Sequence, residues 1–420
     1  MSRRALGIWS ASALVVGNMI GSGVFLLPAS LAPFGATALA GWAITLIGTL
    51  ALAATFARLA MKWPHTGGPY AFARAGFGDA AGFLIAWSYW VSIWSAIAAI
   101  SVAFAGSVGA LFPTLAATPV RSAACALIAL WVCLAINLAG IREAGRAQIV
   151  LTALKIVPLL LFALVAIWFI DRHNLTPTHP AGMSFSTAVN ATAALTLWAM
   201  LGFESATVPA GATENPERTI PRATVFGALL AGTVTVLACT AVTGIVAPDV
   251  LAKSSAPMAD AARQLWGYGA GLAIAALMAV ACLGALNGWV LLSAQVPLAA
   301  AQDGFLPAPF ARLDAKGTPR FALVVSSLLA TLLIVANYTR SLVQLFTFSI
   351  LLSTAATLLP YLAGAGAWLR RGDKRGRIAA TIGFVFAIYA LTGIGGEALL
   401  WGAALLLAGV PVYLWMRRKP

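Results

Sequence analysis

Long apolar stretches follow one another along almost the whole of this 420-residue chain, and charged residues occur mainly between them. Hydrophobic residues make up 61% of the sequence and charged residues 9%, against about 25% charged residues in an ordinary soluble domain. A helix needs about 20 apolar residues to cross the hydrocarbon core of a bilayer. We therefore expect an all-α integral membrane protein, and the composition excludes a soluble globular enzyme.

Apolar runs bounded by charges, glycine and proline predict twelve membrane-spanning helices in a single membrane domain over residues 1–420. The predicted helices cover about 8–32, 35–60, 80–112, 119–140, 147–170, 185–210, 222–247, 266–301, 321–339, 342–369, 378–396 and 398–416. The first run is longer than the apolar region of a signal peptide, so we expect it to remain as the first helix.

The distribution of basic residues predicts the orientation in the membrane. Twelve helices place both ends of the chain on one side, and twenty of the 26 Lys and Arg residues fall on that side. The other side carries five, namely Arg121, Arg172, Lys253, Arg263 and Arg340, while Lys155 lies within a predicted span. Cytoplasmic loops carry the excess of basic residues, so we expect both termini in the cytoplasm. The net charge of +14 is then a topology signal and does not indicate a nucleic-acid partner.

Two of the predicted spans are interrupted by glycine and proline at matching positions. Gly21 precedes Pro28 by seven residues in the first span, and Gly202 precedes Pro209 by seven residues in the sixth, 181 residues later. Glycine and proline are common in membrane helices, so either interruption alone is weak evidence. A separation of five helices makes the two units antiparallel, as an inverted repeat requires. We expect repeats at about 8–170 and 185–369, with extra helices at about 378–416.

Broken helices in corresponding halves are the best sequence pointer to a binding site at the membrane midplane of a transporter. Freed N–H groups and the positive end of a half-helix hold a substrate carboxylate there. Gly21, Ser22 and Gly23 are the candidates for this role, since small residues admit a close approach to the backbone and Ser22 adds a hydroxyl.

Two charged residues lie inside predicted spans. Glu204 falls in the interruption of the sixth span, where a carboxylate costs about 2.5 kcal/mol or more on insertion scales. It is a candidate proton acceptor or partner of a cationic substrate, and the alternative is a tie between two helices. Lys155 in the fifth span either fills the space that a bound Na⁺ takes in a sodium-coupled relative or extends towards the cytoplasmic end near Arg146.

Three aromatic residues within predicted spans are further candidates for the substrate site. Trp198 precedes the break in the sixth span by one turn, Trp289 lies in the eighth span, and Tyr89 lies in the third. Such rings stack on a planar cation or enclose an aliphatic stem, although many membrane aromatics serve as interface anchors or packing. The four cysteines lie in apolar stretches and the three histidines in loops, so no metal site is expected. The sequence contains no HExxH or GxSxG motif that would indicate an enzyme, and no repeated set of polar residues that would indicate a channel.

The interrupted spans and several loops resemble the amino acid–polyamine–organocation superfamily of transporters, and most closely its basic amino acid/polyamine antiporter branch. The likeness runs over nearly the whole chain, and arginine/agmatine antiporters are the most similar group. The matching stretches are 17–28 (GNMIGSGVFLLP), 67–71 (GGPYA), 197–206 (LWAMLGFESA), 214–218 (ENPER), 288–289 (GW) and 303–307 (DGFLP).

The resemblance implies a LeuT-like fold with a 5+5 inverted repeat and alternating access, with no cofactor and with no chemical conversion of the substrate. The substrate site that it implies comprises Asn18, Ile20, Gly21, Ser22, Gly23, Tyr89, Ile97, Trp198, Leu201, Trp289 and Ser353. Trp198 would stack on the substrate, Trp289 would form an inner gate, and Tyr89 would close the outer side. The proton-coupling and gating residues would be Glu204, Tyr70, Lys155 and Tyr361.

Two departures from the arginine/agmatine antiporters bear on the substrate. Those proteins place an Asn in the third helix to hold the guanidinium, where an ungapped count from Tyr89 gives Ile97 here. They are apolar where this chain has Lys155, which proton-coupled and neutral amino acid transporters of the superfamily share. An extra cation disfavours a cationic substrate.

The sequence therefore predicts a sodium-independent exchanger of amino acids and amines in a bacterial inner membrane. A cationic pair such as arginine and agmatine is the first interpretation. The alternative is a neutral amino acid exchanger or a proton-coupled amino acid symporter. The expected partners are a small substrate and the lipid bilayer, and family likeness suggests a homodimer.

Overall fold

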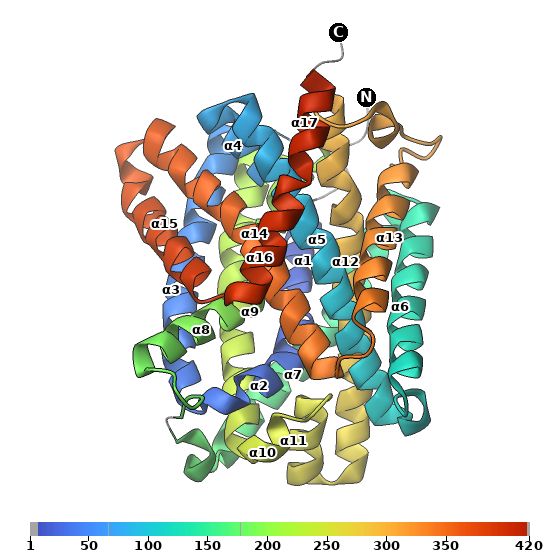
Figure 1. Ribbon diagram of the computed structural model, residues 1–420, viewed down its shortest axis with the longest axis vertical. Coiled ribbons are helices and arrows are strands. Elements are labelled where there is room, and N and C mark those ends of the chain that lie inside the picture. The colour runs from blue at the N-terminus through green and yellow to red at the C-terminus, as the bar shows by residue number, and fades with distance from the viewer. Residues whose placement is uncertain (1–6, 66, 177, 418–420) are drawn as a thin grey trace.

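The computed structural model describes residues 7–65, 67–176 and 178–417, except for the side chains of residues 141–148 and of Ala212. Its regular elements are helices, which form one elongated bundle (Figure 1). The first half contains α1 (Ile8–Met19), α2 (Ser22–Leu31), α3 (Thr37–Lys62), α4 (Pro69–Phe77), α5 (Asp79–Leu111), α6 (Pro119–Ala139) and α7 (Ile141–Ala166). The second half contains α8 (Phe185–Trp198), α9 (Pro216–Ile245), α10 (Pro248–Leu251), α11 (Pro257–Trp266), α12 (Tyr268–Gln302), α13 (Arg320–Ala336), α14 (Leu342–Arg371), α15 (Arg377–Thr392), α16 (Gly396–Leu407) and α17 (Gly409–Arg417).

Ten segments of the described chain are long and apolar enough to cross a membrane. They include α1 and α2 taken together and α16 and α17 taken together, within Ile8–Phe34 and Gly396–Arg417. Two of the twelve predicted spans are not among the ten. The span at 321–339 corresponds to α13, which is apolar but has only 17 residues. The span at 185–210 corresponds to α8, which ends after 14 residues because the helix is interrupted there.

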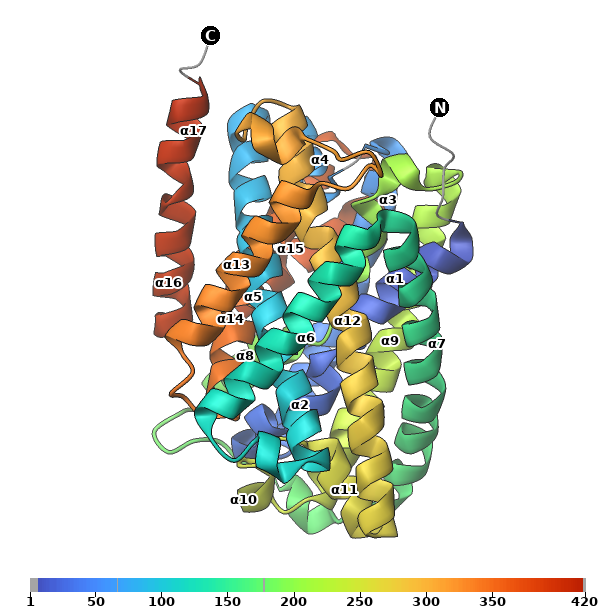
Figure 2. The same ribbon diagram turned by 90° about the vertical axis from the view of Figure 1, so that its right-hand side faces the viewer.

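The two ends of the described chain lie at the same end of the bundle, together with α4, while α10 and α11 lie at the opposite end (Figures 1 and 2). Basic residues predicted on the side of the termini meet at the first end, where Lys62 donates to the carbonyl of Arg371 and Arg370 donates to the carbonyl of Gly76. Four of the predicted basic residues on that side, Arg3, Arg4, Arg418 and Lys419, lie outside the described residues, as do the side chains of Arg142 and Arg146.

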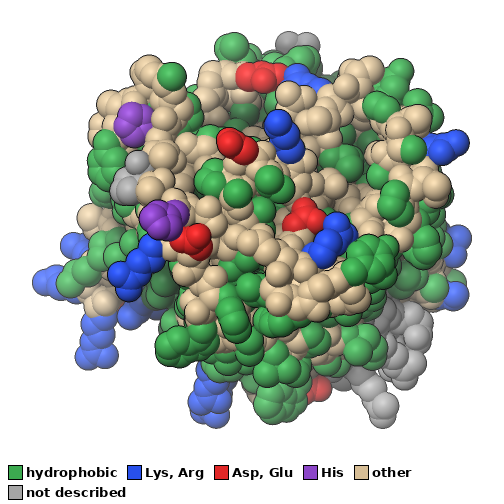
Figure 3. Space-filling view, turned by 90° about the horizontal axis from the view of Figure 1, so that it is seen from below, with side chains coloured by type: hydrophobic (Ala, Val, Ile, Leu, Met, Phe, Trp, Pro, Cys, Tyr) green, Lys and Arg blue, Asp and Glu red, His purple; other side chains and the backbone are tan. Residues whose placement is uncertain are grey.

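The opposite end contains the basic residues predicted on the other side of the membrane. Lys253 and Arg340 line one cavity there, beside the start of α6. Arg340 also forms an ion pair of 2.8 Å with Glu397. Figure 3 looks onto this end, where acidic side chains lie close to basic ones. The described basic residues named above therefore lie at opposite ends of the bundle, according to their predicted side.

The long helices α5 and α12 pack against each other. Nearly all of the most apolar part of α5 is buried in protein. Large apolar side chains on the outer helices are exposed instead, among them Ile128, Leu161, Leu332 and Leu400. An exposed apolar surface of this extent suits a hydrocarbon environment, in agreement with the composition.

Three short helices were not expected from the sequence. The helix α4 follows the Gly67–Gly68 turn, and α10 and α11 lie between α9 and α12. Each begins with a proline in its first turn, where the missing N–H costs nothing. The helix α9 also begins with proline, at Pro216, six residues before the predicted start. Charged and proline-rich stretches were interpreted as loops, whereas here they begin helices.

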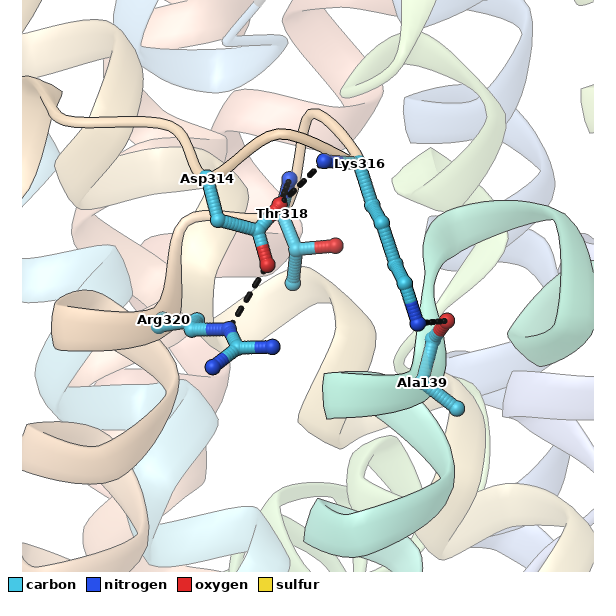
Figure 4. Close-up of polar contacts among 5 residues, drawn as sticks. All are labelled: Ala139, Asp314, Lys316, Thr318 and Arg320. Atoms are coloured by element: carbon cyan, nitrogen blue, oxygen red, sulfur yellow. Dashed lines mark hydrogen bonds and ion pairs between the residues drawn. The ribbon is translucent and has the colours of Figure 1, made fainter.

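The loop between α12 and α13 is organised around Asp314 (Figure 4). Its Oδ1 accepts the backbone N–H groups of Lys316 at 2.8 Å and Thr318 at 2.9 Å, and its Oδ2 accepts Arg320 Nε at 2.6 Å. The hydrogen bond from the Thr318 backbone, followed by those from Lys316 and Arg320, lowers the pKa of Asp314. Lys316 Nζ donates to the carbonyl of Ala139 at 3.4 Å, so this loop also caps the end of α6.

Candidate functional site

The first predicted break is present between α1 and α2. Ile20 and Gly21 leave the helical conformation, with φ and ψ of −81° and 88° at Ile20 and of −138° and −140° at Gly21. A Cβ atom at Gly21 would lie 2.8 Å from the Cβ of Ala285 on α12, which real Cβ contacts do not allow. The absence of a side chain at Gly21 therefore lets the broken segment approach α12.

The second predicted break follows α8. The chain turns after Trp198, passes Gly202 with a φ of 107°, and continues as the 3-10 helix η5 (Phe203–Thr207). A Cβ atom at Gly202 would lie 3.0 Å from the Cβ of Asn18, at the end of α1. At Gly23 it would lie 2.8 Å from Ala199. The two interrupted segments, far apart in the sequence, therefore contact each other directly through glycine.

A narrow cavity of about 10 Å³, room for about one water molecule, lies between the two breaks. It is lined by Asn18, Met19, Gly21, Ser22, Gly23, Ile100, Trp198, Leu201 and Trp289. Seven of these nine residues belong to the predicted substrate site. Met19 and Ile100 were not predicted. Met19 falls within the quoted glycine-rich stretch, whereas nothing in the sequence of α5 distinguishes Ile100 from its apolar neighbours.

Four predicted substrate-site residues do not line this cavity in the described structure. Ile20 and Ile97 are fully buried elsewhere, and the hydroxyl of Ser353 donates to the carbonyl of Ser92 at 2.8 Å. Tyr89 lies eleven residues before Ile100 on α5, about 16 Å nearer the end that contains the termini. Tyr89 is therefore on the side of the cavity that faces the termini, whereas we expected it on the outer side.

Two polar atoms at the cavity are buried and have no hydrogen-bond partner among the described residues. They are Ser22 Oγ, at the first residue of α2, and Asn18 Oδ1, near the end of α1. The amide nitrogen of Asn18 is satisfied by Ser205 Oγ at 2.9 Å. Trp289 Nε1 donates to the backbone carbonyl of Asn18 at 3.4 Å. Both atoms are therefore available for hydrogen bonds to a polar ligand in the cavity.

Lys155 is fully buried and contacts the first break. Its Nζ donates to the carbonyls of Gly17 and Ile20, each at 2.5 Å. These carbonyls belong to the last turn of α1, where the helix dipole is negative. The alternative in which Lys155 extends towards the cytoplasmic end is therefore wrong. The break in α1 leaves carbonyl groups without helical partners, and they attract the amine from α7.

Glu204 is fully buried in the second break and is held by three hydrogen bonds. Its Oε1 accepts the hydroxyl of Tyr89 at 2.9 Å, and its Oε2 accepts the hydroxyl of Tyr361 at 2.8 Å and the N–H of Gly202 at 3.2 Å. Tyr89 lies on α5 and Tyr361 on α14, so the carboxyl group joins the broken helix to two continuous helices. The cluster lies on the side of the cavity that faces the termini.

Tyr70 belongs to a second cluster, nearer the surface at the end that contains the termini. Its hydroxyl donates to Asp303 at 2.5 Å, and Arg74 pairs with Asp303 at 2.8 Å and with Asp79 at 2.8 Å. Burial, with the hydrogen bond to Asp303, raises the pKa of Tyr70 well above its ordinary value. The hydrogen bond to Asp79 raises the pKa of Arg74. The cluster connects α4 to the end of α12 through a neutral tyrosine and a permanently charged arginine.

Within the described part of the chain, no group of three or more His, Cys, Asp and Glu residues could hold a metal ion.

The family model described as amino acid permease matches residues 6–416. The chain belongs to the amino acid permease family. The permease is therefore a transporter and not an enzyme.

Three relatives illustrate the similarity of this permease to proteins with assigned substrates. It is 30% identical to the putrescine transporter PotE of Haemophilus influenzae over 99% of this chain and 97% of that one. It is 33% identical to a putative arginine/ornithine antiporter of Bacillus subtilis, over 86% and 82% of the two chains. It is 34% identical to the cadaverine/lysine antiporter of Escherichia coli, over 80% and 75%.

Proposed function

We propose that this permease is a sodium-independent secondary transporter that exchanges amino acids and related amines across a bacterial inner membrane by alternating access. The observation that carries the proposal is the cavity between two contacting helix breaks, with two buried polar atoms that have no partner in the part of the chain that the structure describes. Broken helices at the midplane are the sites at which transporters of this architecture bind substrates. The names of the three relatives, each a transporter or antiporter of basic amino acids or diamines, support the same class of substrate.

The start of α2 is the proposed site for the substrate carboxylate. The first N–H groups of a helix have no helical acceptors, and its positive end attracts an anion. Ser22 adds a hydroxyl that has no partner among the described residues, and Gly21 and Gly23 leave the backbone accessible. The aliphatic part of the substrate would then lie against Trp198, Leu201 and Ile100, which line the rest of the cavity.

Lys155 is the proposed reason for sodium independence. Carbonyl oxygens at a broken helix are the ligands that sodium-coupled transporters offer to Na⁺. Here the carbonyls of Gly17 and Ile20 already accept hydrogen bonds from Lys155 Nζ. A covalently attached amine therefore occupies this position, and no inorganic cation is required to satisfy the carbonyls at the end of α1.

Glu204, Tyr89 and Tyr361 are the proposed gate on the side of the termini, with Glu204 as its proton-sensitive member. Two hydrogen bonds to one buried carboxyl group link the moving segment to α5 and α14, and a third comes from Gly202 within the segment. A change in the protonation of Glu204 alters which of these bonds it accepts, so opening on this side would depend on pH. Tyr70 would support the same side from the surface, and Trp289 would close the cavity from within.

We propose a cationic amino acid and its decarboxylated amine, such as arginine and agmatine, as the pair of exchanged substrates. The relatives favour a cationic pair, and Trp198 offers a ring face to a cation. A specific observation favours the neutral alternative, since no acidic residue is among the nine that line the described cavity. The residue from α5 is Ile100, and Ile97 one turn away is equally apolar, so neither supplies a guanidinium partner.

The full architecture is also part of the proposal. We propose twelve spans, with helices 1–5 and 6–10 as inverted repeats, both termini in the cytoplasm, and a homodimer as the assembly. The matched breaks support the repeat. The excess of basic residues at the end of the bundle that contains the termini supports the orientation.

Counterflow into proteoliposomes tests the exchange. Vesicles preloaded with an unlabelled amino acid or amine are expected to take up labelled substrate faster than empty vesicles. Equal uptake into empty vesicles under a proton gradient would contradict exchange and favour symport. A thermal-shift panel with arginine, agmatine, lysine, ornithine, putrescine and neutral amino acids, at two pH values, then separates the cationic from the neutral substrate class.

A further inference from the structure

A chain of hydrogen bonds crosses the contact between the two broken segments. Asn18 Nδ2 donates to Ser205 Oγ at 2.9 Å, although the two residues are 187 positions apart. Ser205 Oγ in turn donates to the carbonyl of Gly202 at 2.6 Å. Asn18 is 4% exposed and Ser205 is fully buried, so water does not compete for these bonds. The substrate cavity is thus connected through Ser205 to the backbone of the second break.

The donor pattern fixes the orientation of the Asn18 amide. A serine hydroxyl has one hydrogen, and here that hydrogen is used on the carbonyl of Gly202. Ser205 Oγ therefore only accepts from Asn18, and the NH₂ group must face Ser205. The carbonyl oxygen of the amide, which has no partner among the described residues, is then left at the cavity. A hydroxyl at position 205 thus determines that Asn18 presents an acceptor and not a donor.

The other side of the Gly202 peptide is also engaged. Its N–H donates to Glu204 Oε2 at 3.2 Å, while its carbonyl accepts from Ser205. Gly202 has a φ of 107° and packs its Cα against Asn18, so the peptide has little room to rotate. The position of Ser205 Oγ is therefore set by the same backbone that the Glu204 carboxyl group holds.

We propose that Ser205 is a positioning residue of the substrate site, which orients the Asn18 amide so that its Oδ1 accepts a hydrogen bond from the ammonium group of the substrate. An amino acid with its carboxylate at Ser22 has its ammonium group one carbon away, and Asn18 lies in the last turn of α1, across the break from Ser22, in the lining of the same cavity. The inference rests on the proposed function and assigns the recognition of the amine to a residue pair that spans both breaks.

The test measures binding of labelled L-arginine, L-ornithine, L-lysine and L-leucine to the purified full-length protein. Ser205→Ala is expected to weaken the tightest of these about tenfold, since the Asn18 amide loses its acceptor and no longer has a fixed orientation. Thr207→Val is the matched control, because Thr207 makes the same type of bond in the same segment, to the carbonyl of Glu204 at 2.6 Å, without a bond to α1. The control is expected to change the affinity less than about twofold.

A double-mutant cycle separates positioning from a general structural role. If Ser205 acts through Asn18, Ser205→Ala has no further effect on affinity in the Asn18→Ala background. Ser205→Thr retains the hydroxyl and is expected to restore binding. Ser205→Cys, a weaker acceptor of similar shape, gives an intermediate loss if the alanine variant does not fold.

Additive effects in the cycle, or an equal loss in Thr207→Val, would overturn the assignment of Ser205 while leaving the transporter proposal intact. A wild-type protein that binds none of the four amino acids would refute the proposed function, and this inference with it.

Discussion

Replacement of Lys155 by methionine removes the two hydrogen bonds that α7 donates to carbonyl groups at the first break. Lys155→Met keeps the length of the side chain but leaves the carbonyls of Gly17 and Ile20 without the donor that now lies 2.5 Å from each. A buried polar group without a partner costs about 1–3 kcal/mol, so two of them cost about 2–6 kcal/mol. Removal of the buried amine also removes the free-energy cost of its desolvation. We therefore expect the free energy of unfolding to fall by an amount near the lower limit, about 2–3 kcal/mol.

The chain supplies a matched control in Lys316. Its Nζ also donates to a carbonyl at a helix end, that of Ala139, but both residues are exposed and water replaces the amine when it is removed. Thermal unfolding of the purified protein is expected to occur several degrees lower in Lys155→Met and at an unchanged temperature in Lys316→Met. Counterflow should fall in Lys155→Met alone, because the end of α1 borders the cavity. Equal unfolding temperatures for the two variants would refute the reasoning.

Three further changes test separate parts of the structure. Gly202→Ala is expected to abolish counterflow, because a φ of 107° costs a non-glycine residue about 1–2 kcal/mol and because the new Cβ would meet Asn18. Gly182→Ala is the control. Gly182 has a φ of 81°, but no atom lies within 4 Å of the added Cβ, so this variant should retain transport. Glu204→Ala is expected to flatten the pH dependence of uptake, and an unchanged profile would remove Glu204 from the mechanism. Backbone N–H groups of its loop lower the pKa of Asp314, so its charge stabilises the fold above about pH 4 and this contribution is lost as the pH falls. Asp314→Asn should therefore unfold earlier than wild type at about pH 7, and the difference should shrink as the pH is lowered below about 4.

The helix breaks and the buried charges could be predicted from the sequence because each violates a rule of the membrane environment. Glycine and proline interrupt the hydrogen bonding of a helix where no water is present to replace it. Glu204 and Lys155 place ionisable groups within membrane-spanning segments. Such exceptions are visible in one sequence, since apolar runs make up most of the rest. Of the seven predicted residues that line the cavity, Gly21, Ser22 and Gly23 follow from the first break and Trp198 and Trp289 from the aromatic pattern. Asn18 and Leu201 follow only from the family resemblance.

The residues that the continuous helices contribute could not be predicted in the same way. The helix α5 is buried over most of its length, so periodicity does not distinguish the face that meets the cavity, and the count from Tyr89 gave Ile97 where the cavity has Ile100. The bonds from Tyr89 and Tyr361 to Glu204 join positions 115 and 157 residues apart. Pairings of this kind depend on how three helices cross, which no local pattern contains.

Opposite helix ends meet at the cavity, and this arrangement bears on how one site would accept both members of an exchange pair. The negative end of α1 is occupied by Lys155, whereas the positive start of α2 is without a charged partner among the described residues. An amino acid would use the start of α2 through its carboxylate, but a decarboxylated amine has no such group. In the proposed exchange both substrates would therefore share the acceptor of Asn18 and the ring of Trp198, and only the amino acid would gain from Ser22. Removal of the Ser22 hydroxyl should accordingly weaken the amino acid more than the amine, which follows from the geometry of the break and not from the size of the cavity.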